Sequence, residues 1–334
     1  MNYLIFRNDR VGDLILSSIL LKSIKRSDSN NKIYVICSNA NFDLAKNLSF
    51  IDDAFVLKKG FLNKLKLIIK IYTLKIENIL ILDGKDRSIL FSMLIYAKKK
   101  IYVLNKKKFA FLFVNKKNNL IYDNELNDFK INIIKKTLDK LNLNFSTKDL
   151  NVLGNEKFFI NKQSYKLNFL NKNNYYLLHY DEKWIKTSYI SSYRNIELDI
   201  ENLNSFLISI MNTSRMDLVL TSGKESSKPL NQLKKTMNVL SGNIYFKKNN
   251  NNFLYYIEQP NFNELIEVIY KSILCITCHG SPTHISSSFN KKTIDIVDGS
   301  KIMQYRAYTK HLQNYNEVIR ASVKETTEKI LSLL

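Results

Sequence analysis

The sequence predicts an α/β protein of two Rossmann-like domains whose parallel sheets face a central cleft. Short apolar, β-branched runs alternate with helical patterns along the chain, which is typical of parallel sheets covered by helices. The alternation stops at residues 161–174, a polar stretch rich in Asn and Lys, and then restarts. The chain has 334 residues, 45% of them hydrophobic, which is enough for two cores.

The first domain is predicted to span residues 1–163. Its strand candidates are 3–6, 33–37, 54–57, 78–83 and 100–104, and its helix candidates are 13–26, 41–48, 61–75, 88–97 and 124–141. Each strand candidate is short and rich in Ile, Val and Leu, as buried parallel strands are.

The second domain is predicted to span residues 174–316. Its strand candidates are 175–180, 216–222, 243–246, 273–277 and 293–297, and its helix candidates are 200–213, 229–239, 262–272 and 282–289. A last helix, over 317–333, is expected to form a C-terminal segment, 317–334, that packs back on the N-terminal domain.

Ligands of such sheets bind beyond the carboxyl ends of the strands. The sequence RNDRVGDLILSS follows the first strand and brings Arg7, Asp9, Arg10, Gly12 and Asp13 into one short turn. An acidic residue in the first turn of a helix can serve the helix itself, through capping or its dipole. At the mouth of a cleft, the same Asp13 carboxylate can accept a proton from a hydroxyl group.

Two further turns carry polar candidates. The sequence HYDEKWIKTSY follows the first strand of the second domain, where the ammonium groups of Lys183 and Lys186 could neutralise a phosphate. In TSGKES, Gly223 lies beside Glu225, which could receive a ribose or a base edge. Either lysine could equally be a solvated surface residue.

The stretch CITCHGSPTH contains the C-x-x-C-H pattern of covalent haem attachment. It also holds four zinc-type ligands, Cys275, Cys278, His279 and His284. Haem attachment of this kind belongs to exported proteins, and the N-terminal sequence does not read as a secretory signal. The two cysteines lie three apart on one strand and point to opposite faces, which disfavours zinc.

A phosphate-binding turn explains the same stretch better. A buried strand leads to Gly280, and a helix is then expected to begin with Ser281 as its N-cap and Pro282 at its first position. The backbone N–H groups of such a helix start bind anions, and the hydroxyls of Ser281 and Thr283 can add to them. We therefore expect no haem, no structural zinc and no cofactor.

The charge restricts the class of partner without selecting one. Lys and Arg number 51 and Asp and Glu 30, which gives a net charge of +21. Such a chain attracts nucleic acid, anionic lipid or phosphorylated substrates, unless the lysines only reflect codon composition. No uncharged apolar stretch reaches about 18 residues, and the three cysteines indicate a reducing cytoplasm.

Three of these segments together resemble glycosyltransferase family 9, the heptosyltransferases of lipopolysaccharide synthesis. RNDRVGDLILSS is similar to the family's R-x-D-R-x-G-D-x-x-x-T/S opening, LLHYDEKWIK to its lysine near a tryptophan, and HGSPTH to its D-[S/T]-G-x-x-H turn. The three segments span nearly the whole chain in the family's order.

The resemblance implies a GT-B fold, with an acceptor-binding first domain and a nucleotide-sugar-binding second domain. It implies metal-independent, inverting transfer, with Asp13 as the catalytic base and Lys183 on the donor diphosphate. Ser281 takes the place of the family's glycine, His284 matches its histidine, and Lys186 competes with Lys183 because the spacing to the tryptophan is shorter. His279 stands where the family has an aspartate, so a donor other than ADP-heptose is as open as ADP-heptose itself.

These implications predict a monomeric cytoplasmic enzyme, peripheral on the inner face of the membrane, with a lipid-linked or lipopolysaccharide acceptor and no nucleic acid. A non-catalytic polyanion- or glycan-binding protein and a nucleotide-sugar epimerase are the alternatives. Leu62, Leu65, Ile69 and Tyr72 share one face of the helix at 61–75, which could pack on the sheet. The lysines at 98–100 and 106–108, with Lys116 and Lys117, could instead hold this domain against an anionic membrane.

Overall fold

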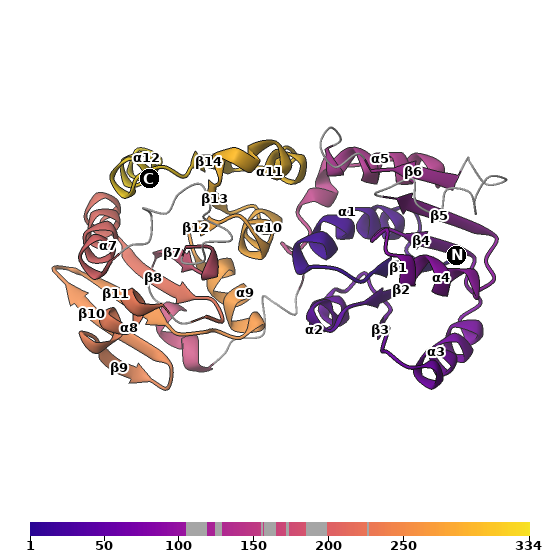
Figure 1. Cartoon of the computed structure of the whole chain (residues 1–334), viewed down its shortest axis with the longest axis horizontal. Helices are drawn as coiled ribbons and strands as arrows, with labels where there is room; N and C mark the ends of the chain where they lie inside the picture. Colours follow the sequence, from indigo (N-terminus) through magenta and orange to yellow (C-terminus); the bar gives the residue numbers. More distant parts are fainter. Residues whose placement is uncertain are drawn as a thin grey trace. The chain divides into compact units, whose positions relative to one another are not determined.

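The computed structural model describes residues 1–104, 119–123, 129–154, 156, 165–171, 174–184, 199–225 and 227–334. The chain divides into two compact units (Figure 1). The first is Met1–Phe158 with Arg306–His311, and the second is Phe159–Tyr305 with Leu312–Leu334. The chain therefore returns to the first unit for a short segment near its C-terminus.

The first unit is a parallel sheet with helices between its strands. Its elements are β1 (Asn2–Arg7), α1 (Val11–Ser27), β2 (Lys32–Cys37), α2 (Asn39–Asn47), β3 (Asp53–Val56), α3 (Phe61–Thr73), β4 (Asn78–Ile81), α4 (Asp86–Met93), β5 (Lys99–Leu104), β6 (Leu120–Tyr122) and α5 (Lys130–Lys140). The strand order is β3-β2-β1-β4-β5-β6. Strands β2 and β3 follow β1 toward one edge of the sheet, and strands β5 and β6 follow β4 toward the other edge.

Side-chain alternation assigns the two faces of this sheet. Leu4 and Phe6 of β1 lie in one core cluster with Ile71 of α3 and Phe91 of α4. The helix α1 contacts α2 and α5, and these three helices cover the opposite face. The β1–α1 and β4–α4 turns therefore meet at the carboxyl edge, where strand order reverses.

The second unit has a longer, mostly parallel sheet. Its elements are β7 (Tyr175–Tyr180), α7 (Ile200–Ser214), β8 (Asp217–Ser222), α8 (Lys228–Lys235), β9 (Asn238–Ser241), β10 (Ile244–Asn249), β11 (Asn252–Ile257), α9 (Phe262–Lys271), β12 (Leu274–Cys278), α10 (Ser281–Ser288), β13 (Lys292–Val297), α11 (Ile302–Thr309), β14 (Tyr315–Ile319) and α12 (Val323–Leu331). The order is β14-β13-β12-β7-β8-β11-β10-β9, and among these described strands β10 alone runs opposite to the rest, antiparallel to both β11 and β9. Here strand order reverses between β7 and β12.

The predicted fold class is confirmed, but some predicted element bounds were wrong and some elements were missed. The helix predicted over 229–239 ends at Lys235, and residues 238–241 form strand β9. The hairpin of β10 and β11 was not predicted; Asn250 turns it with a φ of +54°, a conformation that asparagine tolerates. Strand β6 and helix α11 were also missed.

The C-terminal helix was predicted to begin too early. Residues 315–319 form strand β14, paired with β13, and the helix begins after Ser322, whose hydroxyl accepts a hydrogen bond from the Glu325 N–H. The sequence predicted packing on the N-terminal domain, but α12 packs on α7 and its Ile330 lies in the core of the second unit. In the predicted linker, residues 165–171 form a 3₁₀ helix, and 161–164 and 172–173 lie outside the described residues.

No helix within the described ranges is both long and apolar enough to cross a membrane.

Candidate functional site

The first candidate site is the turn between β1 and α1. Helix α1 begins at Val11 after an N-cap at Arg10, whose side chain makes no capping bond, so Gly12 and Asp13 lie in the first helical turn. The Asn41 amide of α2 donates to the carbonyls of Arg7, Asp9 and Arg10 at 3.2–3.3 Å. This buried side chain fixes the path of the turn.

The Arg7 side chain binds both the backbone carbonyl and the carboxylate of Asp13. The Nε of Arg7 donates to the Asp13 carbonyl oxygen at 3.0 Å, and Nη2 lies 3.5 Å from the Asp13 carboxylate. Nη1 donates to the Leu82 carbonyl at 2.5 Å and lies 3.3 Å from the Asp9 carboxylate. The Asp13 side chain is thus held toward the sheet edge by an arginine, and it makes no capping bond to its own helix.

Asp9 is the titratable neighbour of this pair. Burial raises the pKa of Asp9 to about 6; Arg7 opposes the rise, and the carboxylates of Asp13 and Asp83 add to it. Burial lowers the pKa of Arg7, but the surrounding carboxylates outweigh burial and raise it. The arginine is therefore a fixed positive charge, whereas Asp9 changes charge between mildly acidic and neutral pH.

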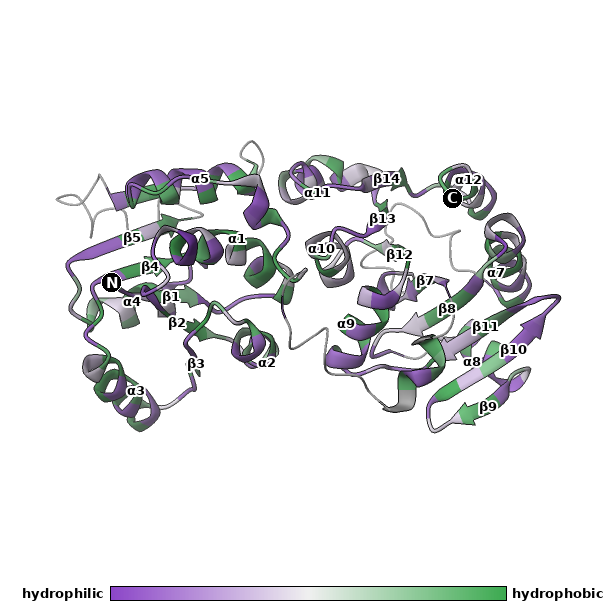
Figure 2. Cartoon of the chain, turned by 180° about the vertical axis from the view of Figure 1, so that it is seen from behind, coloured by the Kyte–Doolittle hydropathy of each residue, from purple (hydrophilic) through white to green (hydrophobic). Residues whose placement is uncertain are grey.

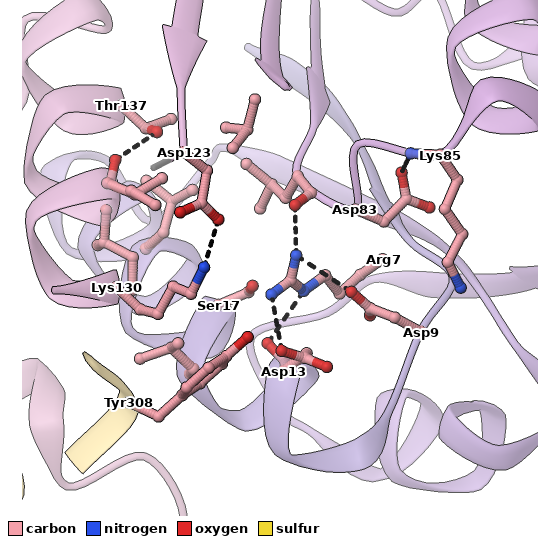
Figure 3. A pocket seen from close by; sticks show the side chains of 16 residues that line it. Arg7, Asp9, Asp13, Ser17, Asp83, Lys85, Asp123, Lys130, Thr137 and Tyr308 are labelled. Carbon is pink, nitrogen blue, oxygen red and sulfur yellow. Dashed lines mark hydrogen bonds and ion pairs between the residues drawn. The ribbon is translucent and has the colours of Figure 1, made fainter. Parts of the chain in front are cut away.

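These side chains open into a cavity of about 220 Å³ in the first unit (Figure 3). Its walls come from the ends of β1, β4, β5 and β6 and from helices α1 and α5, with Tyr308 from the returning segment. The lining residues are Arg7, Asp9, Asp13, Leu16, Ser17, Leu20, Leu82, Asp83, Lys85, Val103, Asp123, Lys130, Ile133, Ile134, Thr137 and Tyr308. Asp13 thus faces a cavity at the point where strand order reverses.

The second candidate site lies in the second unit, where β7 and β12 end. The Lys183 Nζ lies 2.7 Å from the Asp181 carboxylate. Burial lowers the pKa of Lys183, but Asp181 more than offsets this, so the pKa is raised and the ammonium stays charged. A Cβ on Gly280, the N-cap of α10, would lie 2.5 Å from that Nζ. The predicted lysine and the predicted helix start are therefore adjacent.

A buried carboxylate organises the turn around His279. The Asp295 carboxylate lies 2.8 Å from the His279 Nδ1 and accepts hydrogen bonds from Thr283 and Tyr315, each at 3.0 Å. The Thr283 hydroxyl also accepts from the Gly280 N–H at 3.2 Å and is fully buried. The Thr283 hydroxyl therefore serves the fold. Ser281 was predicted as the N-cap, but Gly280 takes that position, and Ser281 is the half-buried first residue of α10.

The other predicted residues differ in their contacts and burial, and some lie outside the described residues. A Cβ on Gly223 would lie 2.4 Å from the Glu182 carboxylate and 3.1 Å from the Asp181 Cα, so the β8 turn approaches the Lys183 turn closely. His284 is buried, with its ring 5.7 Å from that of His279. Glu225 is exposed, and Lys186 lies outside the described residues, as do 106–108, Lys116 and Lys117.

Both cysteines of CITCHGSPTH are buried. Burial raises the pKa of the Cys275 and Cys278 thiols to about 12, which disfavours the thiolate that zinc requires. Within the part of the chain that the structure describes, no three His, Cys, Asp or Glu side chains converge as metal ligands. The absence of haem and zinc stays a prediction.

Sequence reasoning missed several residues of both sites. Asp83 ends a predicted strand, Lys85 follows that strand, and Asp181 precedes Lys183, so the rule that selected Asp13 applied to them as well. Asp123 and Tyr308 carried no such signal, because a very short strand and an unpredicted helix bring them to the cavity, and Lys130 starts a predicted helix rather than following a strand.

The predicted apolar face of α3 does not pack on the sheet. Leu67, Ile68 and Ile71 face the core instead. The exposed apolar residues of α3 and the end of α4 are Phe61, Leu62, Leu65, Ile69, Tyr72, Leu90, Met93, Leu94 and Tyr96, here called the α3–α4 surface. Figure 2 shows apolar segments along α3. Phe61 is 78% exposed and Leu62 70%, and the Tyr72 hydroxyl donates to the Leu94 carbonyl at 3.1 Å, which joins the two helices.

Comparison with known proteins identifies the fold. No family model and no curated protein sequence matches the chain. Among solved structures, Escherichia coli ADP-heptose heptosyltransferase II has a TM-score of 0.66 at 10% identity, covering 100% of this chain and 98% of its own. E. coli heptosyltransferase WaaC with ADP-2-deoxy-2-fluoro heptose has 0.65 at 8% identity, covering 100% of both chains. The family 9 glycosyltransferase of Veillonella parvula has 0.63 at 12% identity, covering 99% and 90%.

At these identities the likeness establishes the fold alone. The chain has the GT-B-like fold of the family 9 heptosyltransferases, as the sequence motifs predicted. The UDP-GlcNAc 2-epimerase of Methanocaldococcus jannaschii is also similar, with a TM-score of 0.54 at 15% identity, covering 99% and 92%.

Proposed function

We propose that this chain is a glycosyltransferase that moves a sugar from a nucleotide-sugar donor to a hydroxyl of a surface-glycan acceptor. The observation that carries the proposal is the arginine-held Asp13 carboxylate facing the cavity at the carboxyl edge of the first sheet. A proton acceptor in a cavity on a glycosyltransferase fold supports deprotonation of an acceptor hydroxyl.

The proposed reaction is a single displacement with inversion. Asp13 takes the hydroxyl proton, the acceptor oxygen bonds to the anomeric carbon, and the bond from that carbon to the diphosphate oxygen breaks. The nucleoside diphosphate leaves with the electron pair. Lys183 and the N–H groups at the start of α10 are suited to stabilise that charge, because both are positive and adjacent. No step in this scheme calls for a metal ion or a cofactor.

The donor and the acceptor are proposed by chemical class. One similar structure is named as holding an ADP-heptose analogue and another as holding ADP, which supports a nucleotide sugar such as ADP-heptose. His279, bound to Asp295, supplies an imidazole where the family motif has an aspartate, so we keep other nucleotide sugars as candidates. The acceptor class is a lipopolysaccharide core or another lipid-linked glycan.

We further propose a cytoplasmic protein that binds the inner leaflet through the α3–α4 surface. Exposed apolar side chains in such a group mark interaction sites, and the exposed lysines Lys58, Lys59, Lys64 and Lys66 favour an anionic membrane. The 98–100 lysines contribute less, since Lys98 pairs with Glu77 at 3.0 Å and the ammonium groups of Lys99 and Lys100 donate to backbone carbonyls.

A panel of nucleotide sugars tests the proposed reaction. The wild-type chain and Asp13→Asn would be incubated with each donor and with glycan acceptors, and products would be identified by mass spectrometry. Transfer by the wild type and not by the variant supports the proposal. Conversion of a donor to its epimer would indicate the epimerase alternative, and tight donor or glycan binding without turnover would indicate the non-catalytic alternative.

A further inference from the structure

Lys183 lies in a short 3₁₀ turn, Glu182–Trp184, directly after β7. The Asp181 carboxylate accepts hydrogen bonds from the Lys183 backbone N–H at 3.1 Å and from its ammonium group at 2.7 Å. On the other side, a Cβ on Gly280 would lie 2.5 Å from the ammonium nitrogen, so the space around that nitrogen is narrow. A small displacement of the turn would therefore move the ammonium group away from the start of α10.

An arginine far along the chain holds this turn from the opposite direction. Arg320 directly follows strand β14 and is only 5% exposed. Its Nη1 donates to the Lys183 carbonyl oxygen at 2.7 Å, and its Nη2 donates to the Trp184 carbonyl oxygen at 3.2 Å. The guanidinium carbon lies 5.5 Å from the centre of the Trp184 ring. The planar guanidinium thus fixes two successive peptide groups of the turn.

The backbone of Arg320 is itself fixed on both sides. Its N–H donates to the Val297 carbonyl oxygen at 2.9 Å, which continues the pairing of β14 with β13. The next N–H, of Ala321, donates to the Thr326 hydroxyl of α12 at 3.0 Å. The guanidinium therefore projects from a junction of fixed backbone, and it can hold the Lys183 turn in one position.

Among the described residues, the positive charge of Arg320 has no carboxylate partner. Both terminal nitrogens bind carbonyl oxygens, and Nε is buried without an acceptor from the part of the chain that the structure describes. Burying a charge that is not paired with an opposite charge is costly, and an apolar side chain could fill the same space. The arrangement is better suited to holding the turn than to maximising the stability of the fold.

We propose that Arg320 is a positioning residue for Lys183, which keeps the ammonium group at the start of α10 in the geometry that a nucleoside diphosphate requires. The inference rests on the proposed function, because that function assigns the diphosphate to Lys183. Arg320 does not contact the ligand itself, since it is buried and its terminal nitrogens are occupied. A misplacement of about 1 Å at a positioning contact can cost about 100-fold, so the loss of Arg320 should weaken binding although the ammonium group remains.

Acetylation of the lysines in the full chain measures the position of Lys183 without any ligand. Peptide mass spectrometry gives the rate of reaction with acetic anhydride at each lysine. Lys183 should react at least about fivefold faster in Arg320→Met than in the wild type, because the reactive neutral amine is disfavoured while the carboxylate of Asp181 is held beside it. Asp181→Asn gives the rate of a lysine released from this ion pair. Lys234, which pairs with Glu258 at 2.9 Å in the same unit, should keep its rate. An unchanged Lys183 rate in a folded Arg320→Met chain overturns the inference.

A double-mutant cycle measures whether Arg320 acts through Lys183. Calorimetry with ADP, UDP and GDP would give dissociation constants for the wild type, Arg320→Met, Lys183→Ala and the double variant. Arg320→Met should weaken the binding of at least one nucleotide about tenfold in the wild-type chain and less than about twofold in the Lys183→Ala chain. Arg215→Met, at an exposed arginine after α7, is the control and should leave binding unchanged. An equal loss in both chains would show that Arg320 acts elsewhere, against the inference.

Arg320→Lys separates geometry from charge. An ammonium group keeps the positive charge but lacks the planar fork that binds two successive carbonyl groups. Lys183 should therefore still be acetylated faster than in the wild type, and nucleotide binding should still be weaker. Full nucleotide binding in this variant would assign the effect to charge alone and contradict the inference. The same variant decides if circular dichroism shows that Arg320→Met does not fold.

Two outcomes separate this inference from the proposed function. Nucleotide binding and sugar transfer that need Lys183 but not Arg320 would leave the glycosyltransferase and refute the inference. Faster acetylation of Lys183 in Arg320→Met, with no nucleotide bound by any chain, would leave Arg320 as the residue that holds Lys183 and refute the proposed function.

Discussion

Arg7 binds Asp13 twice, through the backbone carbonyl at 3.0 Å and through the carboxylate at 3.5 Å. The position of the first turn of α1 and the direction of its acidic side chain are thus set by the same guanidinium. Because that guanidinium also donates to the Leu82 carbonyl after β4, it ties together the two strands between which the order of the sheet reverses.

Asp13→Asn should keep the fold and donor binding and reduce transfer about 10²–10⁴-fold, the usual contribution of a positioned base. Steady-state kinetics and donor calorimetry would measure the two effects. Asp43→Asn, an exposed aspartate of α2, is the control and should leave both unchanged. Near-normal turnover in Asp13→Asn would remove Asp13 from the mechanism.

Asp9 should make the stability of the chain fall as pH rises through mildly acidic values. Its pKa is raised from 3.8 to about 6 in the folded chain, so between these values the folded state holds a proton that the unfolded state has released. When the pH is raised from about 4 to 7, the free energy of unfolding should fall by at most about 3 kcal/mol. Asp9→Asn should remove this part of the dependence, and Asp43→Asn should not. Urea denaturation at a series of pH values measures it, and identical profiles for wild type and Asp9→Asn would contradict it.

Lys183→Ala should weaken nucleoside diphosphate binding by roughly 1.5–3 kcal/mol, the scale of a charge-assisted hydrogen bond. Gly280→Ala should weaken it by a smaller amount, because the added methyl displaces the ammonium without removing it. Calorimetry with ADP, UDP and GDP measures both, with Lys247→Ala on β10 as an exposed control. If Lys183→Ala binds normally and Lys186→Ala does not, the role belongs to Lys186.

The α3–α4 surface should bind vesicles that contain anionic lipid, and the binding should fall steeply with salt. Replacing Phe61, Leu62 and Leu65 with Ser should abolish it, and replacing Lys58, Lys59, Lys64 and Lys66 with Ser should weaken it by on the order of 1 kcal/mol per lysine. Val239→Ser with Leu240→Ser, at an exposed apolar position of β9, is the control. Flotation assays measure the binding. Equal binding to neutral vesicles, or none at low salt, would count against the surface.

The sequence predicted best those site residues that lie in a single turn after a strand. Arg7 and Asp13 lie on either side of one turn, and Lys183 lies in a turn that directly follows a strand, so strand-end reasoning found all three. Lys130 and Tyr308 come together only through tertiary structure, and no local pattern marks them. The error at 317–333 has a physical cause too, since the apolar residues of a five-residue strand are too few to separate a strand period from a helix period.

The return of residues 306–311 to the first unit restricts how this protein can be recombined with relatives. A chimera that exchanges only the N-terminal half would place a foreign counterpart of Lys130 against the native Tyr308. A chimera made to transplant acceptor preference should therefore carry the 306–311 segment along with the N-terminal half. Expression of residues 1–158 alone would yield a fragment whose cavity lacks one wall.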